Sequence, residues 1–343
     1  MQLSIEQIKT ADKQNMLDIL KNFASQCKEP YSSALSQTPY PAPKQIIFAG
    51  MGGSGISGDI ISVIASENSE TPCFVCKDYS LPNWARGKKT LVVAISYSGN
   101  TEETISMLEE AIVHKNPIIC ISNNGKIEQI AKENTFPFIK VPAGYLPRCA
   151  LGHLFFSCHR ILETAKILPP IKPDFFIKME NWIERFFPES NNNLAKNIAI
   201  KLHNKIALLY SGNKLSPALT RWKTQLSENS KTFAFMNTYP ESSHNDIMSW
   251  RHPEWFIKQS IPVFFVSCKE HKKVSRQLDI SQEIIFKKPS GIISLTSEGD
   301  TLLEELFYFI VLGDWVSFYL GILNNENPTE IAEIQLLKQK LGG

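Results

Sequence analysis

Residues 89–115 read KTLVVAISYSGNTEETISMLEEAIVHK and contain the pattern that decides the fold. The apolar run 91–95 gives way to small polar residues, and a segment with helical spacing of apolar residues follows. An apolar run without alternation is typical of a strand that is covered on both faces, as in a parallel sheet. The stretch therefore predicts a strand, a tight loop and a helix, which is the repeating unit of an α/β protein.

The first half of the chain repeats this pattern. Short apolar runs predict strands over residues 44–50, 72–78, 89–96, 117–122 and 136–144. The intervening and following stretches predict helices over residues 52–66, 100–115, 125–134 and 150–168. Because strands that alternate with helices join by right-handed crossovers into one parallel sheet, we expect a doubly wound, three-layer α/β/α fold.

The second half repeats the pattern more weakly. Residues 205–212, 261–268 and 291–299 are predicted strands, and residues 300–323 are a predicted helix. This order indicates an internal duplication of one α/β unit, although few residues match between the halves. The stretch LPPIKP, 168–173, predicts a linker because proline ends a helix. We therefore predict two α/β domains over 41–168 and 174–323, an N-terminal helix and connection over 1–40, and a helical tail over 324–343.

The N-terminal thirty residues predict one helix. Ser4 is the expected cap, with Glu6 and Gln7 in the first turn. Pro30 and the Ser/Pro-rich residues that follow, up to Pro43, predict a loop. The start of the chain lacks a basic end followed by an apolar core, so it is not typical of a secretory signal.

Composition narrows the class of protein. The chain has 343 residues, 43% of them hydrophobic, which suits about two domains with large buried cores. The formal net charge is +2 and no long basic block occurs, so nucleic acid is not the expected partner. The apolar stretch 306–323 contains Asp314. A membrane span would need roughly 20 predominantly apolar residues with few charges, so we expect a buried core helix there and no membrane partner.

Seven cysteines are scattered along the chain. An odd number without regular spacing is typical of a reducing cytoplasm. Cys73 and Cys76 form a CxxC pattern, but zinc would need a second pair of ligands and none stands out. We therefore interpret these two as small apolar residues in a strand, and we expect no metal.

A glycine-rich loop follows the first predicted strand, in AGMGGSGISGD, 49–59. Gly50, Gly52 and Gly55 fit the G-x-G-x-x-G pattern of a dinucleotide site, but the acidic residue that would hold a ribose, Asp78, lies too far along the chain for a good fit. No GxxxxGK[ST] pattern is present, so a nucleoside triphosphate is not expected. We expect no cofactor.

The polar residues after the strand 89–96 point to an anion. Ser96, Ser98 and Thr101 lie just before the helix that is expected to start near Asn100. Free backbone amides at a helix N-terminus favour an anion, and nearby hydroxyl groups add donors. The alternative is that Ser98 or Asn100 simply caps the helix. One such residue would be enough for a cap, so we favour phosphate binding.

At this point a family resemblance becomes specific. The stretch FAGMGGSGISGD, followed some forty residues later by ISYSGNTEET, resembles the sugar isomerase (SIS) domain, a five-stranded parallel unit that binds phosphosugars. With two such units, the chain resembles the bifunctional phosphoglucose/phosphomannose isomerase family. Further matching stretches are PAGYLPRCALGHLF (142–155), RWKTQLSENSKTFAF (221–235), ESSHNDIMSW (241–250) and NPTEIAEIQLLKQKL (327–341).

The resemblance implies an aldose–ketose isomerisation of a hexose phosphate through an enediol(ate), in a homodimer that needs no metal. It implies that Ser96, Ser98 and Thr101 anchor the phosphate, and that Gly53 and Ser54 lie beside the sugar. Mannose 6-phosphate is a second candidate substrate beside glucose 6-phosphate.

The resemblance also implies the catalytic groups. Glu228 matches the carboxylate base, and Arg148 matches an arginine that faces the reacting carbons. His244 matches the ring-opening histidine, which reaches the site of the partner subunit. Lys338 matches a lysine beside the ring oxygen, so the tail would fold back over the site.

Some alternatives stay open. Glu241, three residues before His244, competes with Glu228 for the role of base. Asp246 stands where the family would have glutamate. His153, His203 and His252 are expected to be structural or surface residues. A non-catalytic phosphosugar sensor and an aminosugar isomerase or deglycase are the competing functions.

Overall fold

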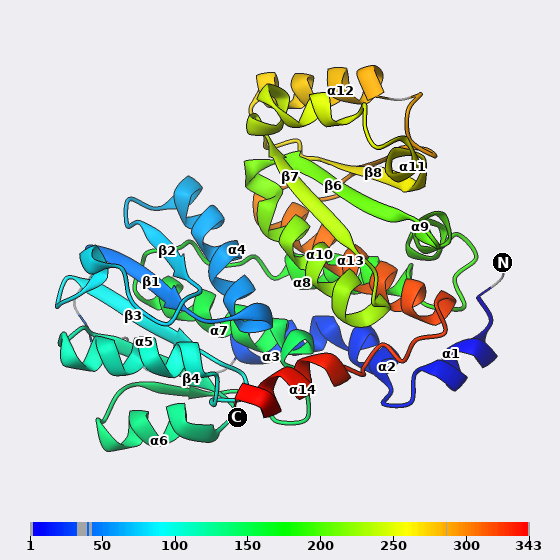
Figure 1. The fold of residues 1–343 in the computed structure, drawn as a ribbon. Helices are drawn as coiled ribbons and strands as arrows, with labels where there is room; N and C mark the ends of the chain where they lie inside the picture. Colours follow the sequence, from blue (N-terminus) through cyan, green and yellow to red (C-terminus); the bar gives the residue numbers. More distant parts are fainter. Residues whose placement is uncertain (1–2, 33–39, 41–42, 286, 342–343) are drawn as a thin grey trace. The chain divides into compact units, whose positions relative to one another are not determined.

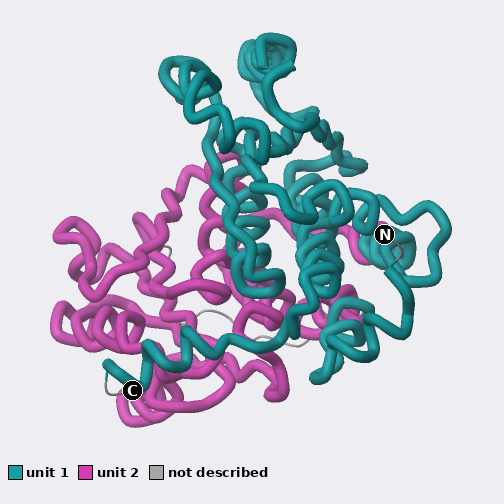
Figure 2. Tube along the Cα trace, turned by 45° about the vertical axis from the view of Figure 1, so that its right-hand side comes forward, with its two compact units in different colours: residues 1–21, 179–343 teal, residues 22–178 magenta. Residues whose placement is uncertain are grey.

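The computed structural model describes residues 3–32, 40, 43–285 and 287–341, and the chain divides into two compact units. Unit 2 comprises residues 22–178, and unit 1 comprises residues 1–21 and 179–343 (Figure 2). Each unit contains one parallel sheet with helices on both faces. The predicted three-layer α/β/α class is confirmed.

Unit 2 is built on a five-stranded sheet of order β2-β1-β3-β4-β5 (Figure 1). The strands are β1 (Gln45–Ala49), β2 (Cys73–Cys76), β3 (Thr90–Ile95), β4 (Ile118–Ser122) and β5 (Phe138–Lys140). All neighbouring strands are parallel. The order is that of a flavodoxin-like sheet, in which the direction of winding switches between β1 and β3.

Both faces of this sheet are covered by helices, as the unbroken apolar strands predict. The helices of unit 2 are α3 (Phe23–Ser32), α4 (Gly52–Asn68), α5 (Glu102–Val113), α6 (Gly125–Glu133), α7 (Leu151–Thr164) and the start of α8 (Asp174–Glu184). Residues of α5 and α6 pack with one face of β1, β3 and β4 in a single buried cluster. On the other face α4 packs directly on β1, where a Cβ at Gly58 would lie 2.7 Å from the Cβ of Phe48.

Unit 1 is built on a four-stranded parallel sheet of order β7-β6-β8-β9. Its strands are β6 (Ile206–Gly212), β7 (Ala234–Tyr239), β8 (Ser260–Val266) and β9 (Ile293–Thr296). The helix α10 (Ser216–Ser230) lies beside the long α13 (Leu302–Leu323) on one face, and α12 (Lys272–Ile285) lies over the other (Figure 1). Its remaining helices are α1 (Ile5–Ala11), α2 (Met16–Lys21), α9 (Leu194–Leu202), α11 (Glu254–Gln259) and α14 (Ala332–Leu341).

The helix α13 confirms the expected buried core helix. Within the described residues it alone has the length and apolar composition of a membrane span. Its most apolar stretch is nevertheless entirely buried in the protein. The internal charge of Asp314 is neutralised by a buried ion pair with Arg221, whose Nε and Nη2 each lie 2.9 Å from a carboxylate oxygen. A paired charge of this kind is typical of a protein core.

Three predictions of local structure were wrong. The N-terminal segment forms α1, α2 and α3 instead of one helix, because Asp12 ends α1 and Asn15 takes a left-handed conformation at φ 59°. Pro30 lies inside α3, not in a loop. The strand β7 was missed, because its partly exposed residues AFMNTY lack a continuous apolar run. Ser4 does cap α1, in a reciprocal capping box with Gln7. The predicted loop up to residue 43 lies largely outside the described residues.

Candidate active site

Three hydroxyl groups converge after β3. Ser96 is 1% exposed, and its Oγ lies 2.8 Å from the Oγ1 of Thr101 and 3.5 Å from the Oγ of Ser98. The amide of Gly99 donates to the Oγ of Ser96 at 3.1 Å. We call residues 96–101 the phosphate loop. Its hydroxyl groups form one cluster at the carboxyl end of a central strand, where ligands of open α/β sheets bind.

The loop can take this shape only with glycine at position 99. Gly99 has φ +69°, and a Cβ there would lie 1.6 Å from the backbone oxygen of Asn124. The helix α5 then begins at Glu102 with Thr101 as its N-cap residue, and no side chain caps it. The side-chain oxygen of Asn100 instead accepts from the amide of Lys126 at 2.9 Å. Neither Ser98 nor Asn100 therefore acts as the N-cap residue of α5, and Thr101 makes no capping hydrogen bond to its first turn.

The glycine-rich loop lies against the phosphate loop and against Arg148. Ser54 Oγ accepts from the amide of Tyr97 at 3.1 Å, which ties the start of α4 to the phosphate loop. A Cβ at Gly53 would lie 2.8 Å from the Cα of Arg148, so α4 approaches the short helix η2 (Pro147–Cys149) closely. Arg148 is 3% exposed. Unit 2 thus brings all of its predicted site residues toward the carboxyl ends of β1 and β3.

Tyr97 is a residue that the sequence analysis missed. Its hydroxyl donates to the backbone oxygen of Pro142 at 3.0 Å and accepts from the amide of Tyr145 at 2.9 Å. Burial raises the pKa of this hydroxyl, which therefore remains a donor at neutral pH. Tyr97 ties the phosphate loop to the segment that precedes Arg148. Its position between Ser96 and Ser98 was visible, but nothing in its residue type indicated this role.

The corresponding loops of unit 1 are occupied by the chain's own carboxylates. In sheet order, β6 and β8 correspond to β1 and β3. After β8, Glu305 accepts from the hydroxyl of Ser267 and from the amide of Cys268 at 2.8 Å. Glu270 accepts from the amide of Lys214 at 3.4 Å, and a Cβ at Gly212 would lie 1.9 Å from its carboxylate. In unit 1, carboxylates of the protein itself therefore accept from the amides of these loops and from the Ser267 hydroxyl.

Glu228 lies in the last turn of α10 and is half-buried. The helix ends at Ser230 because Lys231 takes a left-handed conformation at φ 53°. The ammonium group of Lys231 donates to the backbone oxygen of Glu228 at 3.0 Å and to that of Asn327 at 2.7 Å. These bonds hold the helix end that carries Glu228.

The opposite side of α10 is locked onto α13. Besides the Arg221–Asp314 pair, Gln225 donates to Asp314 at 3.0 Å, and Asn229 donates to the hydroxyl of Ser317 at 3.0 Å. The indole of Trp222 donates to the backbone oxygen of Phe309 at 2.7 Å. Because these bonds are buried, rotation or sliding of α10 would leave polar groups unpaired.

His244 and the competing Glu241 share the short helix η4 (Glu241–His244), and both are exposed. The carboxylate of Glu241 accepts from the side-chain amide of Asn245 at 2.8 Å. The nearby Asp246 faces Tyr210, whose pKa is raised by burial and, secondarily, by that carboxylate. An exposed imidazole on a short turn is accessible to another molecule.

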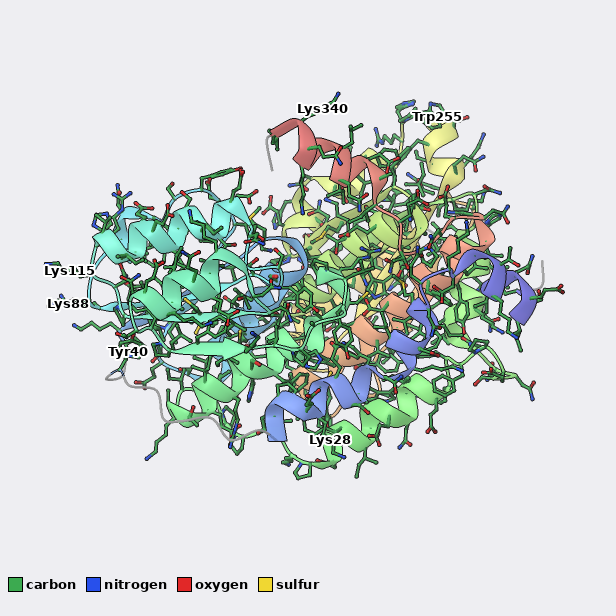
Figure 3. The ribbon with its side chains drawn as sticks, turned by 90° about the horizontal axis from the view of Figure 1, so that it is seen from below. Lys28, Tyr40, Lys88, Lys115, Trp255 and Lys340 are labelled. Carbon is green, nitrogen blue, oxygen red and sulfur yellow. The ribbon has the colours of Figure 1, made fainter. Side chains whose placement is uncertain are left out.

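Lys338 lies on α14, all of whose residues have solvent-exposed surface. Lys340 also lies on α14 and extends away from the ribbon (Figure 3). The predicted residues of unit 1, Glu228, His244 and Lys338, thus come from three different elements.

No cluster of three or more His, Cys, Asp or Glu side chains suited to a metal ion occurs in residues 3–32, 40, 43–285 and 287–341. Cys73 and Cys76 are the two ends of β2 and both are buried, which confirms their interpretation as strand residues. Burial raises the pKa of the Cys73 thiol to about 12. A thiol of this kind is a poor metal ligand, because metals bind the thiolate.

Comparison with known proteins defines the class of this chain first. Residues 41–141 match the SIS domain, and residues 191–341 match the bacterial phospho-glucose isomerase C-terminal SIS domain. A crystal structure of a hypothetical protein from Thermus thermophilus has the same fold, with a TM-score of 0.68 at 13% identity, over 99% of this chain and 90% of that one. The chain is thus a protein of two SIS domains.

Curated relatives then identify the family. A bifunctional phosphoglucose/phosphomannose isomerase of Caldicellulosiruptor bescii is 34% identical over 87% of this chain and 89% of its own length. The enzyme of that name from Aquifex aeolicus is 37% identical over 89% of this chain and 91% of its own length. The chain belongs to the bifunctional phosphoglucose/phosphomannose isomerase family, and it is an isomerase.

Proposed function

We propose that the protein interconverts glucose 6-phosphate, and also mannose 6-phosphate, with fructose 6-phosphate. The observation that carries this proposal is the phosphate loop, where three hydroxyl groups converge before a helix whose N-terminus no side chain caps. A dianionic phosphate would be held there by Ser96, Ser98 and Thr101. That the phosphate belongs to a hexose is inferred from the family to which the chain belongs.

The chemistry is a proton transfer between adjacent carbons. Glu228 takes the proton from carbon two of the open-chain aldose, and the electron pair moves to give an enediol(ate). The same carboxylic acid returns this proton to carbon one. The oxygen on carbon one takes up a proton and the hydroxyl on carbon two gives one up, so carbon two becomes the ketone and carbon one the alcohol. Atoms and electrons balance without a metal or a cofactor, and we propose that the enzyme uses neither. A carboxylate can act in both directions on one face of the substrate.

The remaining groups assist this transfer. Arg148 would stabilise the enediolate, and its guanidinium remains charged at any relevant pH. Its close backbone contact with Gly53 supports a place beside the sugar, with Gly53 and Ser54 near the hydroxyls. His244 would move a proton between the ring oxygen and the hydroxyl on carbon one, and Lys338 would assist beside the ring oxygen.

We further propose that the enzyme is a homodimer in which His244 acts in the site of the partner subunit. The exposure of His244 on the short helix η4 supports this role, because the imidazole is accessible to another molecule. We propose the cytoplasm as its location, where the seven cysteines would remain reduced.

The test replaces Glu228 by Gln and measures isomerisation in a coupled assay alongside fructose 6-phosphate binding by calorimetry. We expect turnover to fall by at least about a hundredfold, the usual scale of losing a general base, while phosphosugar binding persists. Glu241→Gln is the matched control, because Glu241 is the competing carboxylate. Normal turnover by the Glu228 variant, with loss of turnover in the Glu241 variant, would transfer the role of base to Glu241.

Substrate choice is tested by a side-by-side assay of glucose, mannose and glucosamine 6-phosphates on the unmodified enzyme. We expect fructose 6-phosphate from the first two. Binding of all three without conversion would indicate a phosphosugar sensor. Release of ammonia from a fructosamine phosphate would indicate a deglycase.

A further inference from the structure

A buried glutamine joins α3 to the segment that carries Arg148. Gln26, on α3, is 4% exposed, and α3 packs along α7 (Figure 1). Its Nε2 donates to the backbone oxygen of Cys149 at 2.8 Å, and its Oε1 accepts from the amide of Gly152 at 2.8 Å. Both ends of one side chain are thus engaged, one on each side of the junction between η2 and α7.

The start of α7 depends on this distant partner, because no side chain of its own caps it. The N-cap residue is Ala150, which makes no capping hydrogen bond. The amide of Gly152 lies in the first turn, where backbone amides have no partner within a helix. Gln26 supplies that partner from 126 residues away in the sequence. Glycine at position 152 permits the approach, since a Cβ there would lie 2.7 Å from the Oε1 of Gln26.

The segment that carries Arg148 is also held from two other directions. A Cβ at Gly53 would lie 2.8 Å from the Cα of Arg148, so α4 contacts the backbone of η2 directly. The hydroxyl of Tyr97 bonds to two backbone groups of residues 142–145, which precede η2. Gln26 holds the other end, just after Arg148. All of these residues belong to unit 2, so α3, α4 and the phosphate loop together determine where Arg148 lies within that unit.

We propose that Gln26 is a positioning residue for the isomerisation, which holds Arg148 in place for the enediolate through the backbone of residues 149–152. This inference rests on the proposed role of Arg148. That role is to stabilise charge that develops in the transition state. A displacement of about 1 Å in such a group can cost about a hundredfold in rate. Loss of the Gln26 bonds should therefore lower kcat, whereas KM, which depends on how the phosphate is bound, should change little.

The first test replaces Gln26 by Leu, an apolar side chain that makes neither hydrogen bond. We expect kcat to fall by about tenfold, with the KM for fructose 6-phosphate within about twofold of the wild-type value. Asn116→Leu is the matched control. Asn116 is 6% exposed and also bonds to backbone groups, those of residues 85, 87 and 90 at the amino end of β3. The control should lose stability in urea unfolding and keep its kcat.

The second test uses Gln26→Glu, which separates the two hydrogen bonds from the size of the side chain. A protonated carboxyl group has one donor and one acceptor, so it can make both bonds, whereas a carboxylate cannot donate to the oxygen of Cys149. Burial favours the protonated form. At pH 6 we expect Gln26→Glu to turn over at least about five times faster than Gln26→Leu, because both bonds are restored.

The third test asks whether Gln26 acts through Arg148. We expect Arg148→Met alone to lower kcat by about a hundredfold, the scale of losing one group that stabilises charge in the transition state. Adding Gln26→Leu to that variant should lower kcat by less than about twofold more, because two residues that act through one group are not additive. A side chain that only stabilises the fold would lower kcat equally in both backgrounds.

Four results would overturn the proposal: a wild-type kcat in Gln26→Leu, an equal loss of kcat in the Asn116 control, no advantage of Gln26→Glu over Gln26→Leu at pH 6, or a further loss of about tenfold in the double variant. Each leaves the isomerase activity of the unmodified enzyme intact. Failure of the unmodified enzyme to convert any hexose phosphate would instead refute the proposed function, and the role of Gln26 with it.

Discussion

At the scale of the residue, the three hydroxyls of the phosphate loop differ in their surroundings. Ser96 is buried, and its Oγ accepts a hydrogen bond from the amide of Gly99. Ser96 therefore stabilises the conformation of the loop. Ser98 is exposed, and its Oγ makes only long contacts, accepting from the amide of Asn100 at 3.3 Å and lying 3.5 Å from the Oγ of Ser96. Ser98 can therefore be replaced without unfolding the loop, and it is the position where the phosphate contact can be tested cleanly.

We expect Ser98→Asp to raise the KM for fructose 6-phosphate by at least about tenfold while kcat changes little. A carboxylate there repels the phosphate, and the phosphate is gripped equally in ground and transition states. Steady-state kinetics measures both constants, with Ser66→Asp on the exposed face of α4 as the control. An unchanged KM would show that the phosphate binds elsewhere.

A second residue-scale prediction concerns His159, which is 2% exposed and contacts the ring of Tyr31. Burial, and then the charge of Arg160, lowers the pKa of His159 to about 4. The unfolded chain therefore binds this proton at higher pH than the folded one. The contribution of His159 to the free energy of unfolding is fully present above about pH 6.5. It falls by up to about 1.4 kcal/mol per pH unit between pH 6.5 and 4.

We expect His159→Phe to lose less stability than the wild type between pH 7 and pH 5, because it removes this proton site. Urea unfolding at both pH values measures the difference, and the absolute stability of the variant does not enter. His271→Gln, at an exposed histidine, should behave like the wild type. Equal acid sensitivity of the His159 variant and the wild type would contradict the assignment.

At the scale of the element, α10 is the most informative helix of unit 1. One of its faces carries Arg221, Gln225 and Asn229, four residues apart, and all three bond to α13. Residues at this spacing lie along one side of a helix. Glu228 therefore projects from a helix whose rotation and register are held by buried polar bonds.

Asp314→Leu should destabilise the protein by about 3–5 kcal/mol, because it leaves the Arg221 guanidinium buried without its partner. The matched control is Glu298→Gln, which breaks an ion pair with Arg185 that is about half exposed and should cost at most about 1 kcal/mol. Urea unfolding followed by tryptophan fluorescence compares the two. Similar losses of unfolding free energy in both variants would mean that the buried ion pair contributes no more to stability than the exposed one.

At the scale of the whole molecule, the two sheets share a strand order but differ in the loops that follow their strands. β7-β6-β8-β9 repeats the order of β2-β1-β3-β4, yet the loops of unit 1 contact Glu270 and Glu305, whereas the loop after β3 carries the hydroxyl cluster of Ser96, Ser98 and Thr101. Glu228 and His244 of unit 1 remain the proposed catalytic groups, and Ser96, Ser98 and Thr101 of unit 2 the proposed phosphate anchor.

If His244 acts in the partner's site, two inactive variants should restore each other. Mixing Glu228→Gln with His244→Ala after unfolding and refolding together should give about a quarter of wild-type activity, because about half of the dimers are mixed and each has one intact site. Each variant refolded alone is the control. Absence of recovery, with mixed dimers confirmed by mass, would place His244 and Glu228 of one chain in the same site.

Much of the fold could be predicted from the sequence alone. The five strands of unit 2 and the helices that follow them were correctly predicted, because unbroken apolar runs of this length have few other stable environments. The breaks within the N-terminal helical segment and the strand β7 could not be predicted. Asn15 takes a left-handed conformation, which asparagine tolerates but does not require, and Phe235 is exposed although it lies in a strand.

The site divides in the same way. Residue pattern alone predicted the anion loop of Ser96, Ser98 and Thr101, because local spacing determines where a strand ends and a helix begins. Glu228, His244, Arg148 and Lys338 were candidates only through family resemblance, since a glutamate or a lysine on a helix is usually solvated. Only the tertiary structure decided that Arg148 is buried beside Gly53 and that Glu270 and Glu305 contact the loops of unit 1. These facts depend on contacts between residues far apart in the chain, which local sequence cannot specify.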